Sequence, residues 1–225
     1  MDAWHLFPYG GYKMKDMVKI SSSRFPTINL KVIPGHFVTP NSHISHYMDL
    51  ATLKSRQSEA AAVASAMAEA YSSTTIIDTI VCMDGCDVIG AYLADELTKG
   101  GILSQNAHKT MYIVAPERTA NGQIIFRDNN TMMIKGKNVL LLLANSSTGQ
   151  TVMTATNAIK YYGGNVVGIS AIFSAITKIA GMPIHAVFTT ADLGDYHSYA
   201  SDNCDLCKAG VPVDAFANGY GYSQV

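Results

Sequence analysis

A run of small hydroxyl residues around a glycine follows the most apolar segment of the chain, residues 139–144. The run consists of Ser146, Ser147, Thr148, Gly149, Gln150 and Thr151. Hydroxyls and free backbone N–H groups converge on an anion where a buried strand leads into a helix, and the positive helix end favours that charge. The pattern therefore predicts a phosphate-binding loop. A plain cluster of helix N-cap residues explains the same pattern equally well.

A second candidate loop carries two carboxylates, Asp84 and Asp87, on either side of Gly85 and Cys86. It joins an apolar segment, predicted as a strand, to a helical one. Carboxylates in such a loop can coordinate Mg²⁺ or cap the helix that follows. The capping role is favoured for Asp87, and both roles stay open for Asp84.

Cys204 and Cys207 have the spacing of a zinc knuckle, but a structural zinc site needs four ligands. The other two cysteines, Cys82 and Cys86, are expected to be buried near the sheet. Free or loosely paired thiols are therefore the favoured interpretation, and no residue is assigned as a metal ligand.

Three histidines, His36, His43 and His46, cluster in a segment interrupted by prolines and glycines. They could contact a heterocycle or a phosphate, although surface histidines without a ligand are commoner.

The composition excludes several classes of protein. Sixteen Lys and Arg against seventeen Asp and Glu give a formal charge of −1, unlike the basic surface of a nucleic-acid binder. No apolar run approaches the roughly 20 residues of a membrane span, and the first residues do not resemble a signal peptide. Cysteines in apolar surroundings favour a reduced, cytoplasmic protein. Charged residues make up only 15% of the chain, against about 25% in an average domain, which predicts a homodimer.

Helical and strand patterns alternate from residue 58 onward, which predicts a single-domain α/β fold with a mostly parallel, twisted sheet flanked by helices. The predicted helices are residues 59–71, 88–98, a segment from 151 that ends before Gly163, and 174–180. The predicted strands are residues 75–83, 109–115, 123–127, 137–143, 165–172 and 184–189. Asn121-Gly122 predicts a hairpin turn between the second and third of these strands. We divide the chain into an irregular N-terminal hood (1–50), an α/β core (51–200) and a tail with the paired cysteines (201–225).

The segment Ser147-Thr148-Gly149-Gln150-Thr151 resembles the end of the phosphoribosyl pyrophosphate (PRPP) motif of type I phosphoribosyltransferases, which holds the 5-phosphate in that family. Further segments resemble orotate phosphoribosyltransferases in particular. Gly35-His36-Phe37 and residues 45–50 are similar to their N-terminal segment. Residues 83–90 look like their pyrophosphate loop, and residues 115–122 lie where they carry a mobile catalytic loop. The similarity covers roughly residues 30–190 in order.

The resemblance implies an enzyme of pyrimidine nucleotide biosynthesis. It would transfer phosphoribose from PRPP to a nucleobase, release pyrophosphate, use Mg²⁺ and form a homodimer. By the same resemblance residues 146–151 bind the 5-phosphate, and Asp84 and Gly85 lie beside the pyrophosphate. Glu117 and Arg118 are the implied catalytic residues that close over the site.

Two departures from the family pattern bear on activity. The two acids that hold the ribose hydroxyls in the family correspond here to Leu143 and Ala144, and Arg118 is the only cation of the catalytic loop. The leading hypothesis is a phosphoribosyltransferase of the orotate type. The alternative is a non-catalytic protein of the same fold that senses a phosphosugar or nucleotide, or acts as a regulatory subunit. A structural homodimer with an empty site is a weaker third possibility.

Overall fold

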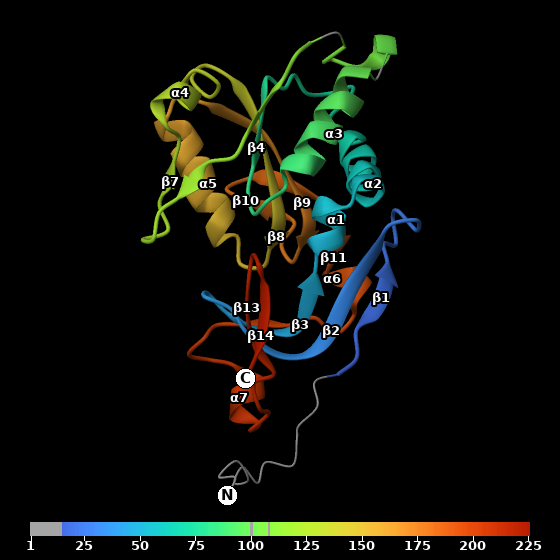
Figure 1. Cartoon of the computed structure of the whole chain (residues 1–225), viewed down its shortest axis with the longest axis vertical. Helices are drawn as coiled ribbons and strands as arrows, with labels where there is room; N and C mark the ends of the chain where they lie inside the picture. The colour runs from blue at the N-terminus through green and yellow to red at the C-terminus, as the bar shows by residue number, and fades with distance from the viewer. Residues whose placement is uncertain (1–14, 100, 108) are drawn as a thin grey trace, which may run out of the picture.

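The computed structural model describes residues 15–99, 101–107 and 109–225. The first fourteen residues of the predicted hood and Gly100, beyond the predicted helix end, lie outside the described residues. Two sheets of six strands dominate the molecule. One sheet with its helices forms the upper part of Figure 1, and the other forms the lower part.

The first sheet has the strand order β10-β11-β9-β8-β4-β5, and every neighbouring pair except β10 with β11 is parallel. Its strands are β4 (Thr79–Cys82), β5 (Tyr112–Val114), β8 (Asn138–Ser146), β9 (Asn165–Ser174), β10 (Lys178–Ile179) and β11 (Met182–Thr189). The predicted α/β fold class with a mostly parallel sheet is confirmed.

Helices cover both faces of this sheet: α2 (Gln57–Ala68) and α3 (Asp87–Lys99) lie on one side, and α5 (Gln150–Tyr161) on the other (Figure 1). Successive side chains of a strand point to opposite faces. Leu140 and Leu142 accordingly belong to the apolar cluster that contains α2 and α3, whereas Leu141 and Leu143 belong to the cluster that contains α5. All four are fully buried, as expected of a strand covered on both faces.

The remaining helices are short: α1 (Ala51–Ser55), η1 (Gly101–Leu103), α4 (Asp128–Thr131), α6 (Thr190–Leu193) and α7 (Asp205–Lys208). Across the described part of the chain, no helix combines the length and the apolar character that crossing a membrane requires.

The second sheet corrects the prediction of an irregular N-terminal segment. It has the order β12-β3-β2-β13-β14, with β1 also paired to β2. Its strands are β1 (Val18–Ser21), β2 (Asn29–Val38), β3 (His43–Asp49), β12 (Ser198–Tyr199), β13 (Ala215–Asn218) and β14 (Gly221–Gln224). Pro34 does not end β2, because it lies where the register with β3 shifts, and a proline is tolerated at such an irregularity.

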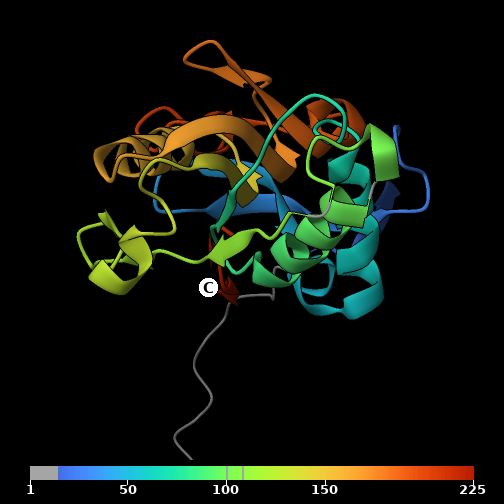
Figure 2. The ribbon, with the colours of Figure 1, turned by 90° about the horizontal axis from the view of Figure 1, so that it is seen from above.

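Two local predictions are also wrong. Residues 174–180 form no helix: Ala180 and Gly181 both have positive φ and make the two-residue turn of a β10–β11 hairpin. The predicted strand at 109–115 does not pair with residues 123–127 either, because β5 lies parallel to β4. The partner of β7 (Ile124–Ile125) is β6 (Glu117–Arg118), joined to it through the turn at Asn121-Gly122. This hairpin and α4 lie at one side of the parallel sheet (yellow-green in Figure 2).

Candidate functional site

A cleft of about 790 Å³ lies where β4 and β8 end. The carboxyl ends of parallel strands are where strand-to-helix loops gather, and ligands of such sheets bind there. One wall consists of the loops after β4 and β8. The opposite wall comes from the second sheet and α1, and it includes the turn between β13 and β14, residues 217–221.

All six residues of the predicted phosphate loop, 146–151, line this cleft. Gly149 is the N-cap residue of α5 and has a φ of 81°. Because a glycine has no side chain, no hydroxyl occupies the N-cap position itself. Thr148 Oγ1 lies 3.4 Å from the backbone N of Gln150, which is long for a hydrogen bond. This geometry favours the anion-binding interpretation of the loop over the N-cap interpretation.

Two serines of the loop differ in their partners. Ser147 Oγ lies 3.0 Å from the hydroxyl of Tyr196, whose pKa is raised by burial. Ser146 Oγ is buried and has no hydrogen-bond partner among the residues that the structure describes. An unsatisfied buried hydroxyl is costly to the fold and points to a missing partner such as a ligand or an ordered water.

The Asp84–Gly85 loop lines the cleft next to Ala144, whose backbone N–H donates to the Asp84 carboxylate. Asp84 and Gly85 both have positive φ, 56° and 75°. Burial raises the pKa of Asp84, and the positive charges of Arg118 and Lys54 and the Ala144 hydrogen bond partly offset that effect. Asp87, by contrast, is exposed in the first turn of α3, where a negative charge stabilises the helix.

The two predicted catalytic residues separate in space. Arg118 lines the cleft, close enough to Asp84 to act on its pKa. Glu117 is exposed, is not among the residues that line the cleft, and accepts a hydrogen bond of 2.7 Å from Arg127 Nε. Successive residues of a strand point to opposite sides, so this hairpin can present only one of the two to the cleft.

Lys54 is a second cation of the cleft that the sequence does not predict. Its Nζ donates to the carbonyl oxygens of Asp84, at 2.8 Å, and Gly219, at 3.3 Å. It therefore joins α1, the loop after β4 and the β13–β14 turn. A lone lysine in a short helical segment carries no sequence signal for this role. Only the packing of the two sheets against each other brings it to the cleft.

None of the three clustered histidines lines the cleft among the described residues. His46 pairs with Ser45 Oγ, 2.8 Å from its Nδ1, and its pKa is lowered mainly by burial. His36 and His43 instead meet Cys204 and Cys207, a combination that the sequence does not predict.

No protein-family model matches the chain. A segment of 67 residues is 34% identical to the orotate phosphoribosyltransferase of Mycobacterium avium, and the match covers 27% of this chain and 37% of that protein. The aligned segment thus spans little more than a third of the relative's length. The crystal structure of orotate phosphoribosyltransferase from Mycobacterium tuberculosis superposes on 73% of this chain and 93% of its own, with a TM-score of 0.50 and 21% identity. The chain has a phosphoribosyltransferase fold.

An adenine phosphoribosyltransferase from Thermoanaerobacter pseudethanolicus also aligns, over 77% of this chain and 95% of its own, with a TM-score of 0.48 and 15% identity. The resemblance to phosphoribosyltransferases that the loop motif indicates is confirmed by the similarity to the two mycobacterial orotate phosphoribosyltransferases. Within this phosphoribosyltransferase fold, the two predicted ligand loops and Arg118 share one cleft.

Proposed function

We propose that the chain binds PRPP in this cleft and transfers its phosphoribosyl group to a nucleobase, as a phosphoribosyltransferase of the orotate type. The observation that carries the proposal is the convergence of the hydroxyl loop 146–151, the Asp84–Gly85 loop and the cations Lys54 and Arg118 on one cleft. A sugar carrying a phosphate at one end and a pyrophosphate at the other needs two such anion sites facing one ribose.

Each end of PRPP meets a different element in this proposal. The 5-phosphate accepts hydrogen bonds from the hydroxyls of residues 146–151 and from the first amides of α5, whose dipole favours the negative charge. The pyrophosphate lies by Gly85, with Lys54 and Arg118 supplying positive charge. Charge develops on the pyrophosphate as the bond to the ribose breaks, so fixed cations there stabilise the transition state more than the ground state.

The carboxylates that line the cleft, Asp49 and Asp84, fit a magnesium ion that is shared with a substrate. Mg²⁺ usually binds through one or two carboxylates together with substrate phosphates and keeps several waters. Asp49 Oδ1 already accepts from the backbone N of Ala51, at 3.0 Å, which fixes the orientation of this carboxylate. When bound, the ion would neutralise charge on the departing pyrophosphate.

The ribose position is where this chain departs from the family pattern. Leu143 is fully buried in the cluster under α5, so only Ala144 of the pair reaches the cleft. A charge-assisted hydrogen bond is worth roughly 1.5–3 kcal/mol, so the acid that is missing at Ala144 weakens PRPP binding by about that amount. Asn145 also lines the cleft, and its amide can donate to and accept from ribose hydroxyls.

Pyrophosphate release tests the proposal directly. The full chain is incubated with PRPP, Mg²⁺ and one base at a time from orotate, uracil and adenine. We expect slow release that depends on the base and is fastest with orotate. Release with only uracil or adenine would support the proposed transferase activity and would contradict the assignment of orotate as the base. PRPP binding without release from any base would instead favour the alternative of a non-catalytic phosphosugar sensor.

A variant separates a weakened PRPP site from a different ligand. Ala144→Asp restores one carboxylate at the cleft and should strengthen PRPP binding by about tenfold or more, the lower limit of a charged hydrogen bond. Ala144→Asn, of the same size and uncharged, is the matched control and should gain less. Equal PRPP affinity for both variants and the parent would show that the ribose does not lie against β8.

A further inference from the structure

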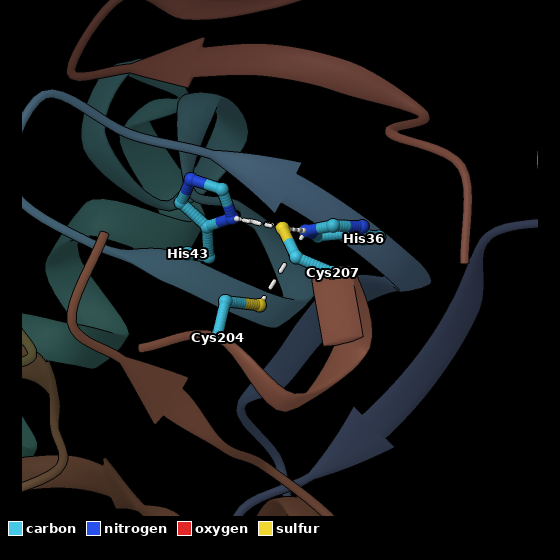
Figure 3. Close-up of side chains that lie close together, drawn as sticks. All are labelled: His36, His43, Cys204 and Cys207. Atoms are coloured by element: carbon cyan, nitrogen blue, oxygen red, sulfur yellow. Dashed lines mark hydrogen bonds between the residues drawn. The ribbon is translucent and has the colours of Figure 1, made fainter. Parts of the chain in front are cut away.

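Four side chains from distant parts of the sequence meet on the second sheet, and none of them is among the residues that line the cleft. They are His36 on β2, His43 on β3, Cys204 at the N-cap of α7, and Cys207 within α7. One nitrogen or sulfur atom from each lies within 4.8 Å of all the others. Figure 3 shows the sulfur of Cys207 between the two imidazole rings, with Cys204 beside it.

Four of the six distances between these atoms are close to the edges of a tetrahedral zinc site, and all six lie within 4.8 Å. Zn–N bonds of about 2.05 Å and Zn–S bonds of about 2.3 Å imply roughly 3.3 Å between two nitrogens and roughly 3.6 Å between nitrogen and sulfur. Here His36 Nε2 lies 3.0 Å from His43 Nδ1, and both sulfurs lie 3.6 Å from His36 Nε2. Cys207 Sγ lies 3.4 Å from His43 Nδ1.

The hydrogen bonding of His36 selects the ring tautomer that a metal-binding histidine needs. Its Nδ1 lies 2.9 Å from the carbonyl oxygen of Val211, which can only accept, so Nδ1 carries the proton. The neutral ring then directs the lone pair of Nε2 at the other three atoms. A ligating histidine characteristically donates its second ring N–H to a carbonyl or carboxylate in this way.

The backbone around the cluster is held in place independently. The backbone N of His36 donates to Asp214 Oδ2 at 2.7 Å, and the backbone N of Asp214 donates to the His36 carbonyl at 2.8 Å. The Asp214 carboxylate lies so close to the backbone of Gly35 that a Cβ at this position would be 2.4 Å from Asp214 Oδ2. His36 and Cys204 are buried while Cys207 is exposed, so an ion has a path in from the surface.

We propose that His36, His43, Cys204 and Cys207 hold one Zn²⁺ ion in a closed, tetrahedral, structural site. Two thiolates and two imidazoles are a donor set that zinc favours, and with four protein ligands no position is left for a substrate. On binding, each thiol loses its proton to solvent and both imidazoles bind as neutral rings, so that two protons leave as one Zn²⁺ enters. No oxidant or reductant is required.

The position of the site suggests what the ion does. It joins residues 204–207 to the β2–β3 hairpin, just before the chain enters β13, which pairs with β2 at Phe37 and Val38. The β13–β14 turn then forms part of the cleft wall. Zinc would therefore fix the C-terminal segment that completes the cleft, without taking part in the reaction.

Metal content and Co²⁺ spectra of the unmodified chain test the proposal first. The protein is purified under reducing conditions without chelator, and we expect about one zinc per chain. Replacing zinc by Co²⁺ should give the visible d–d bands of a tetrahedral ion and a thiolate charge-transfer band. Purified chain that carries no zinc, and whose reduced thiols give neither band with Co²⁺, would overturn the proposal. So would a Cys204–Cys207 disulfide found in protein alkylated at cell lysis.

Variants locate the ligands. His43→Gln should weaken zinc binding more than about 100-fold, because losing even an outer hydrogen-bond partner of a ligand costs 10–100-fold. Cys204→Ser with Cys207→Ser should abolish the cobalt thiolate band. His46→Gln, on the same strand but outside the cluster, is the matched control and should bind zinc like the parent. Undiminished zinc binding by both ligand variants would exclude this cluster as the site.

Discussion

Gly149 combines a left-handed backbone with crowded surroundings. Its φ is 81°, and a Cβ there would lie 2.7 Å from the side-chain ends of both Ile176 and Ile179. Substitution of this glycine therefore perturbs the fold as well as the phosphate loop. The contribution of the loop to binding has to be measured on its hydroxyl residues.

We predict that Gly149→Ala lowers the free energy of unfolding by more than the roughly 1–2 kcal/mol that a left-handed alanine costs. Gly122→Ala is the matched control, because Gly122 has a φ of 78° with nothing within 4 Å of the added Cβ. Urea denaturation of both variants gives the difference due to crowding. Equal losses would mean that the two isoleucines move aside at no cost.

Asp84 makes the fold less stable at neutral pH than at acid pH. Burial raises the folded-state pKa of Asp84 above its ordinary value of 3.8, so the ionised carboxylate is disfavoured in the folded chain. The penalty is absent well below pH 3.8, grows as pH rises through the raised pKa, and is constant above it. Each unit of elevation corresponds to about 1.4 kcal/mol.

Asp84→Asn should therefore stabilise the chain at pH 7 and have little effect near pH 3, since asparagine also tolerates a positive φ. Asp87→Asn is the control with the opposite sign. It removes a charge from the first turn of α3 and should cost about 0.3–1 kcal/mol at pH 7. Thermal melts across this pH range measure both effects. A stability difference between Asp84→Asn and the parent that does not change with pH would contradict the account.

Among the helices and strands, the sequence predicts those that a local pattern of residues determines. The apolar run at 139–144 and the Gly163-Gly164 stop led to β8 and α5 with boundaries close to those found. The sequence does not predict the strand at residues 29–38, because Pro34 and Gly35 interrupt the local pattern. In the structure Pro34 lies at a register shift, and Gly35 allows a close approach to Asp214. Such roles depend on partners far along the chain.

The candidate site was predictable to the same extent. Its loops follow their own strands, so the hydroxyl run and the Asp84–Gly85 turn could be found from spacing alone. Lys54 and the four-residue His–Cys cluster could not, because each joins elements that are adjacent only after folding. The zinc-knuckle spacing of Cys204 and Cys207 was visible, but its two histidine partners lie more than 160 residues earlier.

Lys54 supports a prediction about how elements are held together. Lys54→Met should cost about 1–2 kcal/mol of stability and weaken PRPP binding, since one ammonium donates to both the loop after β4 and the β13–β14 turn. Arg56→Met is the control, because Arg56 is exposed and forms its ion pair locally, with Glu59 three residues further along, at 3.2 Å. Similar losses in both variants would show that Lys54 bridges nothing of consequence.

Among the residues that the structure describes, β5 ends the strand order of the parallel sheet and pairs only with β4. Tyr112 and Ile113 on this edge strand are each 39% exposed, and unpaired edges with apolar side chains favour association. Together with the low charge content, this supports the expected homodimer. Sedimentation at micromolar concentration should give twice the mass of 24.1 kDa. Tyr112→Lys should shift the sedimenting species towards the monomer. Tyr161 is 84% exposed at the end of α5, and Tyr161→Lys should leave the dimer unchanged. A parent chain that sediments as a monomer would remove the prediction.

The central claim is that the cleft between the two sheets binds PRPP through the loop at 146–151, and calorimetric titration with PRPP tests it most directly. We predict saturable binding that Ser147→Ala with Thr148→Val weakens at least tenfold, because hydrogen bonds to a charged phosphate are lost. Thr154→Val should leave binding unchanged, since the Thr154 hydroxyl donates to the Gln150 carbonyl within α5 and Thr154 does not line the cleft. No heat of binding from the parent, or equal affinity in the loop variant, would contradict the claim.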